Sequence, residues 1–254
     1  MPFDPHSTFS LADQVALITG GSRGLGRAIA EGLASAGAHV VIASRDLAAC
    51  EQVAAQIEAR TGRVALPYAV HVGHWAELEP MIDAIYERFG RLDVLVNNAG
   101  MSPLYDSVQS ISEELFDKVI DVNLKGPFRL AAVAGERMAR AGGGSIINIS
   151  SAGSVHPRPH ILPYAAAKAG LNALTVGLAH AFGPTVRCNA IVAGTFLTDV
   201  SKSWDPAAFA ARAEGFALRR GGEPDEIVGA ALYLASPASG YTTGSLLTVD
   251  GGQP

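Results

Sequence analysis

Two side chains that can exchange protons stand four residues apart in this sequence, Tyr164 and Lys168. On a helix this spacing places both on one face, about one turn apart. A free tyrosine titrates near pH 10, so proton transfer near neutrality requires its pKa to fall by roughly 3, which is about 4 kcal/mol. A neighbouring ammonium group favours the phenolate. The pair predicts acid–base chemistry, with the polar face of an amphipathic helix as the alternative.

A glycine-rich run near the start of the chain, Thr19-Gly20-Gly21-Ser22-Arg23-Gly24-Leu25-Gly26, follows the apolar segment Val15–Thr19. After it, Leu25, Ile29 and Leu33 fall on one stripe of a helix. Glycines at such a turn let backbone N–H groups approach a pyrophosphate at the helix N-terminus. The spacing GxxxGxG differs from GxGxxG, but the mechanics are the same. The turn predicts a dinucleotide site formed by Gly20, Ser22, Arg23, Gly24, Leu25 and Gly26.

The same run carries a competing signal, because Gly20-Gly21-Ser22-Arg23-Gly24 also matches the G-x-S-x-G turn of hydrolases. Such a hydrolase needs an oxyanion loop from an earlier strand, and only nineteen residues precede Gly20. Its triad order also needs a late histidine, and the last histidine is His180. These two points disfavour an esterase.

Short β-branched runs alternate with helix-period segments along the whole chain, a pattern typical of βαβ units. We predict an α/β fold, a single-domain Rossmann-type three-layer structure over 1–254 with a doubly wound, seven-stranded parallel sheet. Long helices are expected over Ser112–Arg140 and Pro163–Phe182. Residues 1–12 are expected to form an N-terminal extension, and 195–221 either a substrate lid or a surface helical excursion. The expected strands are Val15–Thr19, Val40–Ala43, Val64–Val70, Val94–Val96, Ser145–Ile149, Val186–Val192 and Leu246–Val249.

Composition restricts the function classes. With 254 residues and 48% hydrophobic content, the chain can bury one large α/β core. A formal charge of −5 without a basic run argues against nucleic acid as a partner. Apolar runs are shorter than the roughly 18 residues of a membrane span, and Met1–Gln14 lacks the apolar core of a secretory signal. These short runs predict no membrane association. Because Cys50 and Cys188 fall in segments that read as helix and buried strand, where isolated thiols behave as small hydrophobes, we expect a cytoplasmic location.

The sequence contains, in this order, the glycine turn, the run Asn97-Asn98-Ala99-Gly100, Ser151, and the pair of Tyr164 and Lys168. On these motifs it resembles the short-chain dehydrogenase/reductase family from about residue 11 to 252. Ser151 precedes Tyr164 by 13 residues, the interval of the family. Among its subgroups, the sequence is similar to the 3-oxoacyl carrier-protein reductases and the NADPH-dependent ketone reductases. The resemblance implies a homo-oligomer, either a tetramer or a dimer. Further matches are Asp93, Asn123, Thr243-Gly244 and Asp250-Gly251-Gly252.

The resemblance implies an oxidoreductase that transfers a hydride between NADP(H) and the carbonyl or secondary alcohol of a small molecule. Tyr164 would act as acid and base, Lys168 would also bind the nicotinamide ribose, and Ser151 would bind the substrate oxygen. Asn123 would hold a water that links Lys168 to solvent. The alternative is a catalytically silent nucleotide-binding sensor or scaffold of the same fold. The identity of the substrate stays open, including whether it is a carrier-protein thioester.

The end of the second strand bears on the choice of cofactor. Relatives that prefer NAD have a carboxylate there, whereas this chain has Ser44 followed by Arg45. Together with Arg23, two guanidinium groups could flank a 2′-phosphate, an anion that planar bidentate donors suit. We therefore predict NADP(H) in preference to NAD(H). In the alternative, Arg45 is solvated surface and Asp46 reaches the ribose, although Asp46 also suits a helix cap.

Two positions depart from the family pattern. His71 stands where the family usually has an aspartate near the adenine, and Val72 can still supply a backbone contact there. Ala193-Gly194 replaces the usual Pro-Gly, while Thr198 matches a threonine near the carboxamide. The remaining residues expected to contact the cofactor are Asn98, Ala99, Gly100, Gly194, Tyr164 and Lys168.

Two histidine pairs have a spacing that metal ligands can use, His71 with His74 and His156 with His160. Prolines break any helix between the second pair, and no cysteine or carboxylate cluster completes a tetrahedral set. The sequence therefore predicts no metal site. The loop that contains His156 and His160 also contains Arg158 and lies between Ser151 and Tyr164, so it is expected to border the substrate pocket.

Overall fold

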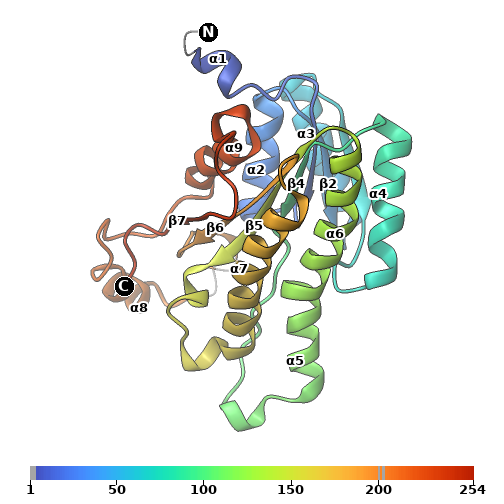
Figure 1. The fold of residues 1–254 in the computed structure, drawn as a ribbon. Helices are drawn as coiled ribbons and strands as arrows, with labels where there is room; N and C mark the ends of the chain where they lie inside the picture. Colours follow the sequence, from blue (N-terminus) through green and yellow to red (C-terminus); the bar gives the residue numbers. More distant parts are fainter. Residues whose placement is uncertain (1–3, 200, 202–203) are drawn as a thin grey trace.

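The computed structural model describes residues 4–199, 201 and 204–254. Residues 1–3 of the expected extension and residues 200, 202 and 203 of the segment 195–221 lie outside this described part. Seven parallel strands form one sheet in the order β3-β2-β1-β4-β5-β6-β7 (Figure 1). This confirms the doubly wound, seven-stranded parallel sheet. The strands are β1 Val15–Thr19, β2 His39–Ser44, β3 Ala65–Ala69, β4 Val94–Asn97, β5 Gly144–Ser151, β6 Val186–Ala193 and β7 Leu246–Val249.

Helices cover both faces of the sheet and give the expected three layers. Helices α2, α3 and α9 pack on one face, and α4, α6 and α7 on the other. The predicted Pro163–Phe182 helix is confirmed as α7, which begins one residue earlier. The α-helices of the described part are α1 Pro5–Thr8, α2 Gly24–Ser35, α3 Leu47–Thr61, α4 Trp75–Phe89, α5 Glu113–Ile120, α6 Gly126–Arg140, α7 Leu162–Phe182, α8 Pro206–Ala213 and α9 Val228–Ala235.

The central strands are apolar throughout because both faces of the sheet are covered. All five residues of β1 are buried, and their side chains alternate between the two cores. Ile29 and Leu33 of α2 lie fully buried in the first core, as their helical stripe predicts. Leu11, near the end of the expected extension, is also fully buried there. The sheet is therefore a rigid support for the loops that follow its strands.

The helix expected over Ser112–Arg140 is interrupted in the structure. Between α5 and α6, residues Asp121–Lys125 form a π-helical turn. The side-chain amide of Asn123 donates to the Val119 carbonyl oxygen at 2.9 Å, an oxygen that the helix backbone would otherwise use. Just beyond the turn, a Cβ at Gly126 would lie only 2.1 Å from the Val72 carbonyl oxygen. A close approach of α6 to the loop after β3 therefore accompanies the widened turn.

In the part of the chain that the structure describes, no helix is both long and apolar enough to cross a membrane.

Candidate active site

The residues predicted to bind cofactor and substrate follow the carboxyl ends of neighbouring strands. Because all seven strands are parallel, these ends meet along one edge of the sheet. The strand order reverses direction between β1 and β4, and such a switch point is where open α/β sheets bind ligands. In sheet order, the edge carries His71 after β3, Ser44 at the end of β2, Gly20 after β1, Asn98 after β4, Ser151 at the end of β5 and Gly194 after β6.

The glycine turn has the geometry of an anion cradle. Gly20 and Gly24 adopt φ values of +65° and +52°, which side chains disfavour. A Cβ at Gly26 would lie 2.3 Å from both the Gly20 carbonyl oxygen and the Asn98 Nδ2, so only glycine fits. Helix α2 begins at Gly24, and the side chain of Arg23 at its N-cap makes no capping hydrogen bond. The first N–H groups of α2 are therefore available to an anion.

Hydrogen bonds join this turn to the loop after β4. The Thr19 hydroxyl oxygen accepts from the backbone N–H groups of Asn98, at 3.0 Å, and Ala99, at 3.1 Å. The Asn98 side chain donates to the Thr19 carbonyl oxygen at 2.8 Å. Thr19 is not among the site residues predicted from sequence, although a hydroxyl at the end of an otherwise apolar strand was a usable signal. Together these bonds fix two of the predicted cofactor loops against each other.

Arg45 and His71 follow the ends of β2 and β3. Arg45 is exposed, and neither it nor Arg23 forms an ion pair with another described residue. Asp46 accepts from the Ala49 N–H at 3.1 Å and so caps α3. His71 is half-buried and stacks on His74, with 4.2 Å between ring centroids. Burial, and then the charges of His74 and Arg45, lower the pKa of His71, so Arg45 lies near this ring.

Ser151, Tyr164 and Lys168 come together at the junction of β5 and α7. Ser151 is the last residue of β5, and its Oγ accepts from the Gly153 N–H at 3.1 Å. Tyr164 and Lys168 lie on the first two turns of α7. The Lys168 Nζ donates to the Ile149 carbonyl oxygen at 2.7 Å and lies 5.7 Å from the centroid of the Tyr164 ring. A Cβ at Gly153 would lie 3.4 Å from the Ser151 Oγ and 4.0 Å from a ring carbon of Tyr164, so these two side chains lie close together.

Burial governs the protonation of the two titratable groups in this trio. It raises the pKa of the Tyr164 phenol, and the hydrogen bond from Ser151 opposes this rise. Burial also lowers the pKa of Lys168 from 10.5 to about 8. For the protein without nicotinamide, desolvation outweighs the hydrogen bond, and the pKa of the phenol lies above its usual value. The protein alone therefore favours the neutral phenol, the form that can donate a proton.

Asn123 is fully buried beside the trio. Its Nδ2 donates to the carbonyl oxygens of Met101, at 2.8 Å, and Val119, while its Oδ1 accepts from the Met101 N–H. A Cβ at Gly100 would lie 2.9 Å from the Asn123 Oδ1 and 3.7 Å from the Lys168 Nζ. The side chains of Asn123 and Lys168 therefore both lie close to Gly100.

The loop after β6 completes the edge. The Gly194 N–H donates to the Val249 carbonyl oxygen at 3.0 Å, and a Cβ at Gly194 would lie 2.5 Å from the Asp250 Cα. The side chain of Thr198 would lie 3.4 Å from a Cβ at Gly24, so this loop reaches the glycine turn. Within the described ranges, no group of three or more His, Cys, Asp and Glu side chains could hold a metal ion.

Comparison with known proteins agrees with this geometry. A family model described as enoyl-(acyl carrier protein) reductase matches residues 20–253. Dehydrogenase/reductase SDR family member 4 of Homo sapiens is 34% identical over 247 residues, which are 96% of this chain and 88% of that protein. This chain belongs to the short-chain dehydrogenase/reductase family. L-rhamnose 1-dehydrogenase (NAD(P)(+)) of Azotobacter vinelandii is 37% identical over 251 residues, covering 95% of this chain and 97% of that protein.

Solved structures show the same relationship. The NADPH-dependent 3-quinuclidinone reductase of Rhodotorula rubra superposes with a TM-score of 0.94 at 31% identity, covering 100% of this chain and 96% of that chain. As a short-chain dehydrogenase/reductase, this protein is an oxidoreductase of alcohol and carbonyl groups.

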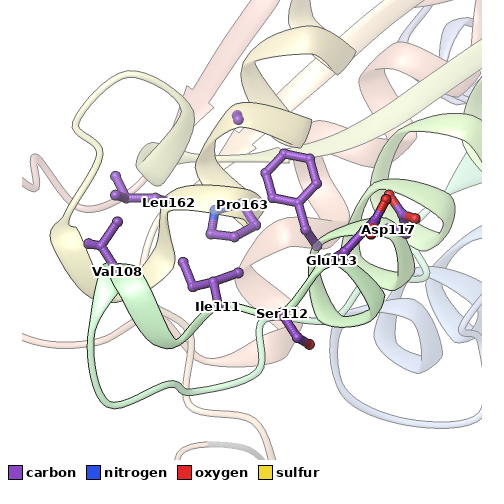
Figure 2. A pocket seen from close by; sticks show the side chains of 9 residues that line it. Val108, Ile111, Ser112, Glu113, Asp117, Leu162 and Pro163 are labelled. Atoms are coloured by element: carbon purple, nitrogen blue, oxygen red, sulfur yellow. The ribbon is translucent and has the colours of Figure 1, made fainter.

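An open groove of about 750 Å³ lies between α5 and α7. Figure 2 shows the apolar side chains of Val108, Ile111, Leu162 and Pro163 gathered in it, with the carboxylates of Glu113 and Asp117 to one side. On α7 the groove is lined by Leu162, Pro163 and Ala166, and Ala166 is two residues from Tyr164. Two residues correspond to about 200° around a helix, so Ala166 lines the groove from a different face of α7 from that of Tyr164.

Proposed function

We propose that this short-chain dehydrogenase/reductase interconverts a ketone and a secondary alcohol with NADP(H) in preference to NAD(H). The observation that supports this most is the cluster of Ser151, Tyr164 and Lys168 at the carboxyl edge of the sheet, next to a glycine cradle fit for a pyrophosphate. When bound, the nicotinamide supplies or accepts the hydride. The protein supplies the placement of the groups and the proton.

Each residue of the cluster has a defined part in this proposal. Tyr164 donates its phenolic proton to the substrate oxygen during reduction and accepts it during oxidation. Ser151 hydrogen-bonds the same oxygen and holds it beside the phenol. Lys168 places a cation beside the ring, stabilises the phenolate left after proton transfer and binds the nicotinamide ribose. Asn123 positions a water that returns the proton from solvent through Lys168.

The proposed cofactor preference rests on the ends of β1 and β2. Arg45 and Arg23 offer guanidinium donors that no described acidic group uses, and they suit a 2′-phosphate. Asp46, the carboxylate that would instead bind the ribose of NAD, is engaged as the cap of α3. The glycine turn binds the pyrophosphate, and His71 and Val72 border the adenine. Asn98 through Gly100, Gly194 and Thr198 line the nicotinamide half of the groove.

A titration with NADPH and with NADH tests the proposed function and the cofactor preference together. We expect Arg45→Ala to weaken NADPH binding by about tenfold or more, which is at least 1.4 kcal/mol, and to leave NADH binding unchanged. Arg60→Ala, an exposed arginine on α3 that pairs with Glu31, is the matched control and leaves both affinities unchanged. Binding of neither cofactor would overturn the enzyme proposal, and an NADH preference insensitive to Arg45 would overturn the NADP assignment.

A silent sensor of the same fold would also bind nucleotide, so turnover distinguishes it from an enzyme. A sensor has no need of a phenol with a serine hydroxyl beside it and an ammonium group 5.7 Å from its ring centroid, and this arrangement favours the enzyme. Reduction of a neutral ketone panel with NADPH supports the enzyme. Tight NADPH binding with no turnover of any ketone supports the sensor.

We further propose a homo-oligomer that uses the groove between α5 and α7. Phe116 and Leu162 in the groove, and Val176 further along α7, expose 43%, 37% and 41% of their surface, and a second copy would bury them. The proposed location is the cytoplasm, since Cys50 and Cys188 are both buried free thiols. The segment 195–221 is proposed to cover a small ketone or alcohol substrate.

A further inference from the structure

Two arginines without acidic partners among the described residues lie on segments at the carboxyl end of the sheet. Arg158 lies in the loop between Ser151 and Tyr164, and Arg212 lies on α8. Among the described residues neither forms an ion pair, whereas Arg91 and Arg220 do. The charge of Arg158 is near enough to lower the pKa of Arg212, in addition to the larger effect of burial. In Figure 1, α8 and the loop after β5 lie at the same end of the sheet.

Arg212 is held at a defined place on the carboxyl edge. Its Nη2 donates to the Thr195 Oγ1 at 2.6 Å, and this hydroxyl donates in turn to the Gln253 Oε1 at 2.9 Å. Thr195 comes two residues after Ala193, the residue of β6 that pairs with Ser151 of β5. Neighbouring strands are about 4.8 Å apart, so Arg212 is anchored to the loop that follows the strand next to Ser151.

Aromatic rings restrict the Arg212 side chain further. Its guanidinium carbon lies 5.8 Å from the ring centroid of Trp204, 5.7 Å from that of Phe209 and 5.6 Å from that of Phe216. An arginine has five N–H donors, and the described contacts of Arg212 use one of them. A fixed guanidinium with unused donors is prepared for an anionic ligand, because little side-chain freedom is lost on binding.

Arg158 is held in place by the loop that carries it. The Tyr105 hydroxyl donates to the carbonyl oxygen of Pro159 at 2.6 Å and accepts from the Leu162 N–H at 2.7 Å. These two bonds fix the loop on both sides of the short 3₁₀ turn that follows Arg158. Arg158 is thus attached to the loop that joins β5 to α7, and Arg212 to the loop that follows β6.

We propose that Arg158 and Arg212 together bind an anionic substituent of the substrate, so that the preferred ketones are oxo acids or ketone phosphates rather than neutral ketones. This inference rests on the proposed function and specifies its substrate class. Two like charges held close together without a counterion repel each other, and a bound anion removes that repulsion. An anion at this rim also orients the carbonyl group toward Ser151 and Tyr164.

The test compares oxo acids with their methyl esters, which lack the negative charge and carry one additional methyl group. The values of kcat/KM with NADPH are measured for 3-oxobutanoate, 4-oxopentanoate and 5-oxohexanoate, and for the methyl ester of each, in the wild-type protein and in Arg158→Gln and Arg212→Gln. Arg60→Gln is the matched control, an exposed arginine on α3. We expect the wild type to prefer the acid over the ester for at least one chain length. We expect each rim variant to reduce that preference by about tenfold or more with the ester rate unchanged, and the control to keep it.

Equal rates for acid and ester in the wild type, or a preference that neither rim variant reduces, would overturn the anionic rim. Turnover of the esters would still support the proposed oxidoreductase, so the two failures are distinguishable. Acetonyl phosphate, included as a further substrate, separates a phosphate from a carboxylate preference. If no ketone is reduced, calorimetric binding of 4-oxopentanoate to the NADP-loaded protein decides: binding lost in Arg158→Gln supports the rim, and no binding overturns it.

Discussion

Burial of Lys168 should make this protein less stable near neutral pH than the same fold without that charge. The pKa of Lys168 is lowered from 10.5 to about 8, which corresponds to about 3 kcal/mol. Below pH 8 the ammonium is protonated in the folded and unfolded states, so folding carries the whole desolvation penalty. Between pH 8 and 10.5 the unfolded chain binds more protons, and stability rises with pH. The penalty is gone above pH 10.5.

We therefore expect the difference in unfolding free energy between the wild type and Lys168→Met to change with pH. Relative to the variant, the wild type gains roughly 2 to 3 kcal/mol between pH 7 and pH 10. The variant also leaves the Ile149 carbonyl oxygen without the Lys168 hydrogen bond, a loss of about 1–3 kcal/mol that does not depend on pH. The change with pH, rather than the sign at one pH, therefore isolates the buried charge.

Urea unfolding at fixed protein concentration, repeated at pH 7, 8, 9 and 10, measures this difference. Lys118→Met is the matched control, because Lys118 is exposed on α5. We expect its difference from the wild type to stay within about 0.5 kcal/mol at each pH. A difference between the wild type and Lys168→Met that is just as flat would refute the claim that desolvation of Lys168 dominates its titration.

Three further predictions follow from individual contacts. Gly26→Ala places a Cβ 2.3 Å from the Gly20 carbonyl oxygen, so it should destabilise the fold by about 1–3 kcal/mol and abolish NADPH binding. Gly229→Ala, which has open space around it, should do neither. Urea unfolding measures the stability of both variants, and calorimetry measures their NADPH binding. Asn123→Ala removes three hydrogen bonds and should lower the unfolding free energy by about 1–3 kcal/mol, which unchanged urea curves would contradict. Phe116→Glu should shift the protein to a smaller assembly in light scattering, and an unchanged mass would exclude the groove as the interface.

Much of the fold follows from local patterns in the sequence. Apolar, β-branched runs become strands that are buried on both faces of the sheet. Their bounds differ from the expected ones by only a few residues, since each strand ends where its hydrogen bonding with the neighbouring strand ends. The glycine turn was predictable because a Cβ is sterically excluded at Gly26 whatever the rest of the fold does. The one-turn spacing of Tyr164 and Lys168 held because it depends only on the helix.

Other features depend on tertiary contacts that no local pattern contains. The π-helical turn at Asp121–Lys125 accompanies the close approach of Gly126 to Val72, which lies far away in the sequence. The burial around α7, which raises the pKa of the Tyr164 phenol in the protein alone, cannot be read from residue spacing. The contact of Arg212 with Thr195 likewise depends on how the chain folds back after β6.

The central claim is that Tyr164 is the proton donor of a carbonyl reductase, and one variant tests it directly. Tyr164→Phe removes the hydroxyl and keeps the ring, and Tyr241→Phe, at a fully exposed position, is the control. The account predicts NADPH binding unchanged within about threefold and kcat for ketone reduction lowered by at least about a hundredfold, the contribution typical of a positioned acid. Turnover close to that of the wild type, with NADPH binding intact, would contradict it.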